Sequence, residues 1–128
     1  WYLDRMGTPE SLEDLQNHQC LMYRNDQGVV SPWELADEGV FEPENVKLMT
    51  NSYDLLISSA CMGLGLAVLP RTPIWPKLEA GELVQVMPEI VSAKLWASLV
   101  YSATNIIPPK VRAFLDFTQE FLGPMFEQ

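Results

Sequence analysis

The chain has 128 residues, of which 17 are acidic, 8 are basic and one is histidine, so its formal net charge is −9. This length suits one compact domain, and a hydrophobic fraction of 48% supplies a core, which excludes a disordered chain. No apolar run approaches the ~20 residues of a membrane span, and the acidic balance without a Lys/Arg cluster excludes nucleic-acid binding by this stretch itself. Because the chain neither opens with Met nor carries an export leader, we expect a processed chain or a piece of a longer one.

The first part of the chain predicts short helices followed by strands. Residues 2–6 form one helical turn that Gly7 stops. Ser11 is an N-cap with Asp14 as its acidic partner, which opens a short helix to about Gln16. The next expected elements are a buried strand over 19–24, a turn over 25–28, an irregular or hairpin-like stretch over 29–41 and a strand over 45–49.

A helix over residues 51–63 is the clearest element. We expect Asn51 as its N-cap, Asp54 as an acidic residue in the first turn and Gly63 as the left-handed residue that ends it. An apolar strand over 66–69 follows, and the order strand, helix, strand predicts a parallel sheet. The apolar stripe of the helix comprises Tyr53, Leu56, Ile57, Ala60 and Cys61.

The last part of the chain predicts further alternation of helix and strand, so the fold class is α/β. Residues 72–78 contain two prolines and predict short helical turns rather than one helix. Strands are expected over 83–86 and 95–101, and a helix starts at Pro109 and ends at Gly123. One face of this last helix carries Val111, Phe114, Leu115, Thr118, Phe121 and Leu122.

We find no catalytic constellation, and we expect no enzyme. His18 follows Asp14 by one helical turn, but no Gly-x-Ser-x-Gly elbow supplies a nucleophile, so His18 is interpreted as a helix-end residue near the last carbonyls. Residues 63–65 (GLG) lack the third glycine of a dinucleotide loop. The neighbouring carboxylates, interpreted as solvated surface, are Glu13, Asp14, Asp37 and Glu38.

The two cysteines, Cys20 and Cys61, lie within apolar runs. They are too few for a disulfide framework, and with one histidine they form no common zinc spacing, so we expect no metal and no cofactor. We interpret them as reduced thiols of the core, with a redox pair as the alternative. A reducing cytoplasm fits this use of cysteine.

One candidate binding site stands out, at the junction of the expected strand 45–49 and the helix that follows. Thr50, Asn51 and Ser52 place hydroxyl and amide groups beside free backbone N–H groups. A helix N-terminus beyond the carboxyl end of a parallel strand binds anions or polar ligands. The alternative is that Asn51 and Ser52 only cap the helix. Arg24 also follows an expected strand, where it either binds a carboxylate or points into water.

Four segments, in order, resemble LysR-type transcriptional regulators. They are residues 2–18, with YL, GTP, EDL and a histidine, then 63–70 (GLGLAVLP), 80–84 (AGELV) and 110–117 (KVRAFLDF). The resemblance implies a fold like that of type 2 periplasmic binding proteins, in which two α/β lobes with mixed, partly parallel sheets flanked by helices enclose an effector cleft. It assigns residues 1–94 to the second lobe and 95–128 to the return into the first.

The resemblance further implies that a small-molecule effector, an anionic metabolite being one class, binds between the lobes. The winged helix-turn-helix that contacts promoter DNA and the front half of the first lobe are absent from this chain. The whole protein would be a cytoplasmic homo-oligomer without membrane contact. In this chain, which lacks the front half of the first lobe, apolar surface around Phe114, Phe117 and Phe121 would be exposed. The candidate effector contacts are Thr50, Asn51 and Ser52, then Tyr23 and Arg24, and lastly Pro70.

Two other classes remain open from sequence. A lobe of a solute-binding protein that serves a transporter shares the expected fold but requires export. An enzyme on a related two-lobe scaffold requires reactive groups outside this chain.

Overall fold

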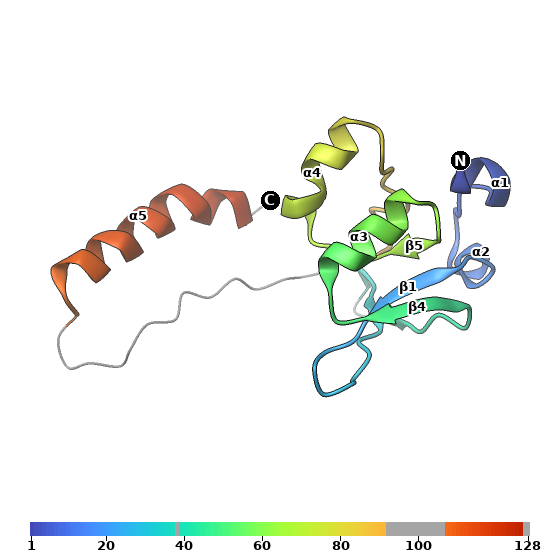
Figure 1. Ribbon diagram of the computed structural model, residues 1–128, viewed down its shortest axis with the longest axis horizontal. Coiled ribbons are helices and arrows are strands. Elements are labelled where there is room, and N and C mark those ends of the chain that lie inside the picture. Colours follow the sequence, from blue (N-terminus) through green and yellow to red (C-terminus); the bar gives the residue numbers. More distant parts are fainter. Residues whose placement is uncertain (38, 92–106, 127–128) are drawn as a thin grey trace. The chain divides into compact units, whose positions relative to one another are not determined.

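The computed structural model describes residues 1–37, 39–91 and 107–126. The chain divides into two compact units, Trp1–Lys94 and Leu95–Gln128. The first unit contains a sheet with its helices (Figure 1), and the described part of the second is one helix, α5 (Pro109–Phe126). The strand expected over 95–101 lies outside the described residues.

A three-stranded parallel sheet organises the first unit. Its strands are β1 (Cys20–Tyr23), β4 (Val46–Thr50) and β5 (Leu66–Ala67), and β1 lies between the other two. Helix α3 (Tyr53–Cys61) joins β4 to β5, so this connection crosses β1. The predicted parallel strand–helix–strand unit is therefore confirmed.

Helix α3 covers one face of the sheet and packs against all three strands. Leu21 of β1 and Leu56 of α3 are almost completely buried, and Ile57 is 6% exposed. The predicted stripe is confirmed at its centre, whereas Ala60 and Cys61 are only half-buried. Because burial of a leucine side chain contributes about 2 kcal/mol, this face is a principal source of stability.

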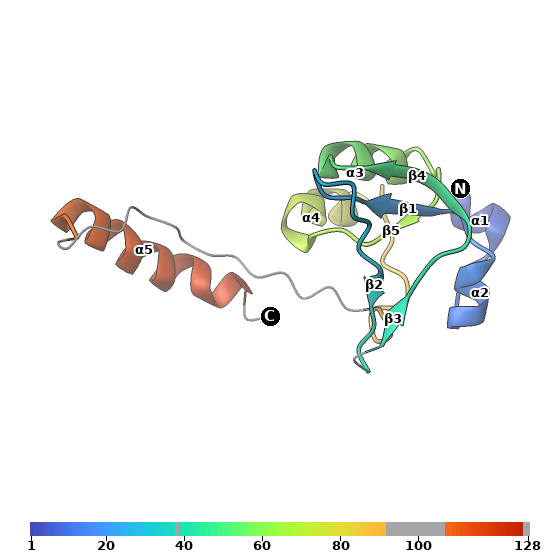
Figure 2. The same ribbon diagram turned by 90° about the horizontal axis from the view of Figure 1, so that it is seen from below.

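A short antiparallel hairpin lies on the opposite side of the sheet from α3 (Figure 2). It pairs β2 (Trp33–Glu34) with β3 (Val40–Phe41), which confirms the hairpin-like expectation for residues 29–41. The rings of Trp33 and Phe41 lie 5.8 Å apart between centroids and pack into one core cluster. The buried residues of this cluster are Leu15, Cys20, Met22, Trp33, Phe41 and Met87.

Two short helices precede β1, as predicted. Helix α1 (Tyr2–Met6) ends at Gly7, whose φ of 84° is accessible mainly to glycine. Helix α2 (Leu12–Gln16) begins with a complete capping box, because the Ser11 side chain accepts from the Asp14 N–H and the Asp14 carboxylate accepts from the Ser11 N–H.

The glycines at 63 and 65 have separate roles. Gly63 has a φ of 68° directly after α3, which confirms its predicted role as the residue that ends the helix. Gly65 leaves room for the carbonyl of Gln19, since a Cβ there would collide with that oxygen. The Leu66 N–H donates to the same carbonyl at 2.8 Å, so Gly65 permits β5 to dock on β1.

Three expectations for residues 66–86 need correction. The strand over 66–69 is only Leu66–Ala67, and it is half-buried at the sheet edge. The stretch predicted to form short turns, 72–78, lies in one helix, α4 (Arg71–Glu79). Pro73 lies in its first turn, where the backbone N–H groups have no partner within the helix, and Pro76 removes only one backbone hydrogen bond. The strand over 83–86 does not form, since the Leu83 N–H instead donates to the carbonyl of Lys77 at 3.2 Å, beyond the end of α4.

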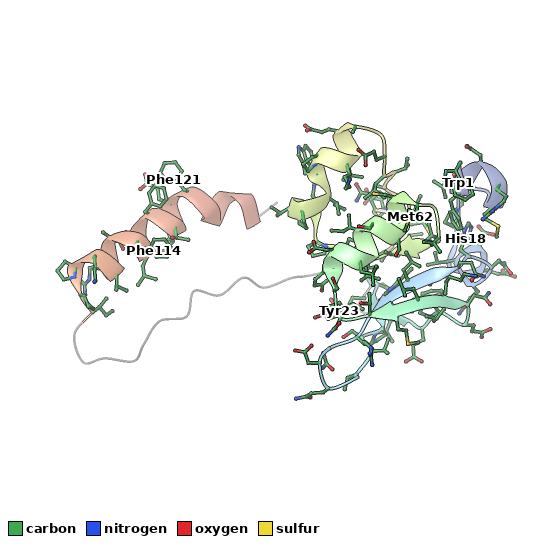
Figure 3. The ribbon with its side chains drawn as sticks, viewed as in Figure 1. Trp1, His18, Tyr23, Met62, Phe114 and Phe121 are labelled. Carbon is green, nitrogen blue, oxygen red and sulfur yellow. The ribbon has the colours of Figure 1, made fainter. Side chains whose placement is uncertain are left out.

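Helix α5 starts at Pro109 as predicted, but it continues through Gly123 to Phe126. Pro124 lies inside this helix and removes one backbone hydrogen bond, but the loss of that bond does not end the helix. Phe114, Phe117 and Phe121 are 60%, 55% and 60% exposed, as the resemblance implied. Figure 3 shows Phe114 and Phe121 on α5. Among the helices within the described ranges, none is both long and apolar enough to cross a membrane.

Leu56→Ala is expected to lower the free energy of unfolding by about 3 kcal/mol, because it leaves a cavity between α3 and the sheet. Leu55→Ala is the matched control: Leu55 is 46% exposed, and its change is expected to stay within about 0.5 kcal/mol. Urea unfolding followed by circular dichroism measures both. Equal losses for the two variants would contradict the described packing of α3.

Candidate functional site

The carboxyl ends of β1 and β4 meet at one edge of the sheet and bring three predicted site residues together. Tyr23 ends β1 and pairs in register with Thr50, which ends β4. The Arg24 N–H donates to the Thr50 carbonyl at 2.9 Å, so the pairing continues one residue beyond β1. Arg24 is exposed, and its guanidinium is therefore accessible to a ligand at this edge.

Thr50, Asn51 and Ser52 form the turn from β4 into α3. Thr50 is 8% exposed, and its Oγ1 accepts from the Ser52 N–H at 3.1 Å. The N-cap is Ser52 and not Asn51 as expected, because the Ser52 Oγ accepts from the Leu55 N–H at 3.3 Å. Asp54 is consequently the second residue of the helix rather than the third.

Asn51 does not cap α3 and has a different hydrogen-bond partner. Its Nδ2 donates to Asp26 Oδ1 at 3.0 Å, which joins the turn after β1 to the turn after β4. With the amide nitrogen engaged in this way, the Oδ1 of the exposed Asn51 remains as a hydrogen-bond acceptor.

The first turn of α3 presents two backbone donors. Among the described residues, no group accepts a hydrogen bond from the N–H of Tyr53 or of Asp54. These N–H groups carry the positive end of the helix dipole, which favours a negative or strongly polar ligand. The Asp54 carboxylate in the same turn opposes a highly charged anion.

Tyr53 is a site residue that the sequence did not assign. Its ring stacks on Tyr23, with centroids 4.5 Å apart and planes 7° from parallel, so an aromatic pair stands beside the helix N-terminus. Burial and the neighbouring Tyr23 raise the pKa of the Tyr53 hydroxyl, which therefore stays protonated at neutral pH. The sequence showed Tyr53 only as a member of the apolar stripe, and it gave no signal for Asp26 as the partner of Asn51.

Pro70, the remaining predicted residue, lies at the N-cap of α4, three residues after the end of β5. It is half-buried and has no N–H to donate, so its ring and its carbonyl are the groups that it offers to an effector.

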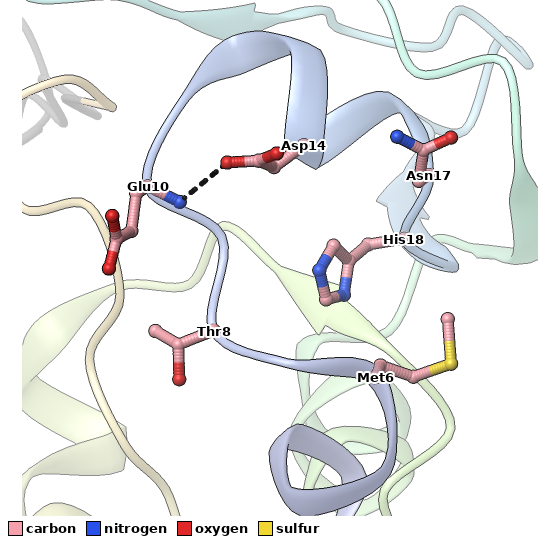
Figure 4. A pocket seen from close by; sticks show the side chains of 6 residues that line it. All are labelled: Met6, Thr8, Glu10, Asp14, Asn17 and His18. Atoms are coloured by element: carbon pink, nitrogen blue, oxygen red, sulfur yellow. Dashed lines mark hydrogen bonds between the residues drawn. The ribbon is translucent and has the colours of Figure 1, made fainter.

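A shallow hollow lies at the opposite end of β1 (Figures 3 and 4). Asp14 is not free to act as a base there, because hydrogen bonds from the Glu10 and Ser11 N–H groups lower its pKa. Within the described chain no hydrogen bond joins Asp14 to His18, so the two do not form a catalytic dyad. The lining residues are Met6, Thr8, Glu10, Asp14, Asn17 and His18.

His18 follows the C-cap of α2, and its N–H donates to the Leu15 carbonyl at 3.1 Å, as expected of a residue at the helix end. Its ring is 4% exposed and lies against Tyr2, with Nδ1 3.2 Å from the Tyr2 hydroxyl. The cysteines are free thiols, and burial raises the pKa of Cys20 to about 11. Cys20 is accordingly an inert core residue, and Cys61 is half-buried at the end of α3.

Comparison with known proteins identifies the family. The model of the LysR substrate binding domain matches residues 2–123. The chain belongs to this family. It is 33% identical over 121 residues to the HTH-type transcriptional activator TtdR of Escherichia coli K12, covering 91% of this chain and 38% of TtdR. It is 31% identical over 124 residues to the HTH-type transcriptional regulator CrgA of Neisseria meningitidis, covering 95% of this chain and 41% of CrgA.

Solved structures of LysR-family proteins have the same fold. The regulatory domain of AphB from Vibrio vulnificus superposes with a TM-score of 0.67 at 20% identity, covering 94% of this chain and 60% of that domain. CrgA, a LysR-type transcriptional regulator from Neisseria meningitidis, superposes with a TM-score of 0.59 at 28% identity, covering 73% of this chain and 32% of CrgA. These matches confirm the predicted α/β fold of the periplasmic-binding-protein type.

Ser52→Ala is expected to lower the free energy of unfolding by about 1 kcal/mol, because it removes the N-cap of α3. Asn51→Ala removes only the exposed hydrogen bond to Asp26, so the free energy of unfolding is expected to change by less than about 0.5 kcal/mol. Thermal unfolding of the two variants beside the unaltered chain measures the difference. A larger loss for Asn51→Ala would restore Asn51 as the capping residue.

Proposed function

We propose that this chain is the effector-sensing part of a LysR-type transcriptional regulator. The observation that supports it best is the convergence of Arg24, Thr50, Asn51 and Ser52 with the open N–H groups of α3 at one edge of the sheet. In parallel α/β sheets, ligands bind beyond the carboxyl ends of the strands. Membership of the family of LysR substrate binding domains supports a function in binding rather than in catalysis for this edge.

The two units correspond, in this proposal, to different parts of a two-lobe domain. Residues 1–94 form the second lobe, and 95–128 return into the first. The chain spans 38% to 41% of the curated relatives described above, so a first lobe and a DNA-binding segment belong to the proposed whole protein. That protein would be a cytoplasmic homo-oligomer whose promoter contacts lie outside this chain.

The effector would shift a population between two arrangements of the lobes rather than undergo a reaction. A ligand held at the carboxyl edge and by the opposing lobe favours the closed arrangement to the extent that it binds that arrangement more tightly. The changed geometry of the oligomer would then alter promoter binding.

The chemistry of the edge narrows the class of effector. The N–H groups of Tyr53 and Asp54, together with the Arg24 guanidinium, suit a carboxylate or a sulfate-like group. Asn51 Oδ1 suits a hydroxyl, while Asp26 and Asp54 disfavour several negative charges on one ligand. We propose an anionic or hydroxylated metabolite with one charged group at this edge.

A lobe of a transporter's solute-binding protein has less support, since the relatives described above are transcriptional regulators. An enzyme also has less support, because the carboxyl edge supplies no paired nucleophile and base among the described residues.

In the whole protein, Asn51→Ala is expected to reduce the effector response by about tenfold. DNA affinity without effector should stay unchanged, because the only other contact that the variant removes is the exposed pair with Asp26, which contributes little to stability. Promoter binding with and without effector, measured by fluorescence anisotropy, tests this. Asn17→Ala, at the opposite edge of the sheet, is the matched control. An equal loss of basal DNA affinity in the Asn51 variant would indicate a folding defect and reject the effector role.

The anion preference is testable on the chain itself. Titration with sodium sulfate, followed by amide NMR, is expected to shift the Tyr53 and Asp54 N–H signals with saturation. Arg24→Gln should weaken this binding several-fold, whereas Arg112→Gln on α5 removes the same charge elsewhere and should leave it unchanged. Uniform, unsaturated shifts in all three proteins would reject an anion site at this edge.

A further inference from the structure

Tyr2, His18 and the backbone N–H of Gln19 form a hydrogen-bonded chain that fixes α1 to the start of β1. The Gln19 N–H donates to the Tyr2 hydroxyl oxygen at 3.0 Å, and the same hydroxyl lies 3.2 Å from His18 Nδ1. Because the oxygen accepts from Gln19, its own proton is available to Nδ1. That arrangement requires a neutral imidazole whose proton is on Nε2.

This hydrogen-bonded chain attaches α1 through its buried residue, Tyr2. Tyr2 is the buried residue of that helix, at 6% exposure, and the remaining four residues of α1 are half-buried or exposed. Next to it, the Trp1 indole lies against Gly63 after α3, so closely that a Cβ on Gly63 would collide with the ring. The Trp1 contact therefore reports whether α1 is in place.

We propose that the Tyr2–His18–Gln19 chain is an acid-sensitive latch, which holds α1 on the sheet while His18 is neutral and releases it when Nδ1 takes up a proton. A protonated Nδ1 and the Tyr2 hydroxyl are both donors, so the hydroxyl proton must turn away from the imidazole. The hydroxyl proton thereby loses the acceptor that Nδ1 provides, and Tyr2 is only 6% exposed, so the loss falls on a buried group.

The charged groups around His18 do not reverse the preference of this site for a neutral imidazole. Burial lowers the pKa of His18, and the Asp14 carboxylate raises it by a smaller amount, so the net shift is downward. The folded pKa is thus below the unfolded value, and the stability from neutral His18 is complete above about pH 6.5 and is lost as the pH falls toward the folded pKa. The titratable or charged side chains on the surrounding elements are Tyr2, Asp4, Arg5, Glu10, Glu13, Asp14, Cys20 and Cys61.

NMR spectroscopy of the 128-residue chain tests the latch, because its one histidine gives a single imidazole signal. The imidazole is expected to titrate below about pH 6.5, and the Trp1–Gly63 nuclear Overhauser contact should be lost at the same midpoint while β1 and α3 amide signals persist. A midpoint at or above that value would overturn the proposal. So would a Trp1–Gly63 contact that survives protonation, or the simultaneous loss of the β1 signals.

Two variants separate the latch from a general effect of acid. His18→Gln keeps a polar side chain that does not titrate, so the Trp1–Gly63 contact should persist through the same pH range. Tyr2→Phe keeps the ring but removes the hydroxyl, so loss of the contact should no longer share a midpoint with the imidazole. If acid releases α1 in His18→Gln as it does in the unaltered chain, His18 is not the switch.

Discussion

The pairing of β1 with a parallel strand on each side is the constraint on which both ends of the first unit depend. Since all three strands run in the same direction, β1 and β4 end together at the edge where Tyr23, Arg24 and Thr50 meet. The opposite end of β1 receives α1 and α2, with His18 between them. The crossover through α3 fixes this order, and Gly65 allows β5 to approach Gln19 closely enough to complete it.

The carboxyl edge combines rigid support with accessible donors. Thr50 and Ser52 use their hydroxyl oxygens to hold the turn and cap the helix, which leaves the Tyr53 and Asp54 N–H groups open. The Asp26 carboxylate holds Asn51 from a separate turn. A site whose polar groups are held in place before the ligand arrives loses less entropy on binding, which would suit the effector site that we propose at this edge.

The two edges differ in how they respond to solution conditions. At the carboxyl edge the backbone N–H groups of α3 do not titrate, so they offer the same donors across the physiological pH range. At the amino edge, a buried hydrogen bond to His18 depends on one proton. A lobe with both features would sense a ligand at one edge and acidity at the other, with β1 as the rigid element between them.

Local signals in the sequence determined the elements that depend on neighbouring residues. The capping box at Ser11, the turn at Gly7, the stripe of α3 and its end at Gly63 were all predicted, because hydrogen bonds and backbone angles within a few residues decide them. The strand–helix–strand order also indicated a parallel sheet, and the helix N-terminus after β4, together with the family resemblance, predicted a ligand site at this edge.

Tertiary structure decided what depends on distant partners. Asn51 and Ser52 are both good N-cap residues by sequence, but only Ser52 caps α3, because the Asn51 amide donates to Asp26 instead. Residues 83–86 have strand-like composition but form no strand, because the chain there folds back on the end of α4, where the Leu83 N–H donates to the Lys77 carbonyl. The burial of His18 against Tyr2 arises in the same way, since a contact across sixteen positions is set by how α1 packs and not by local pattern.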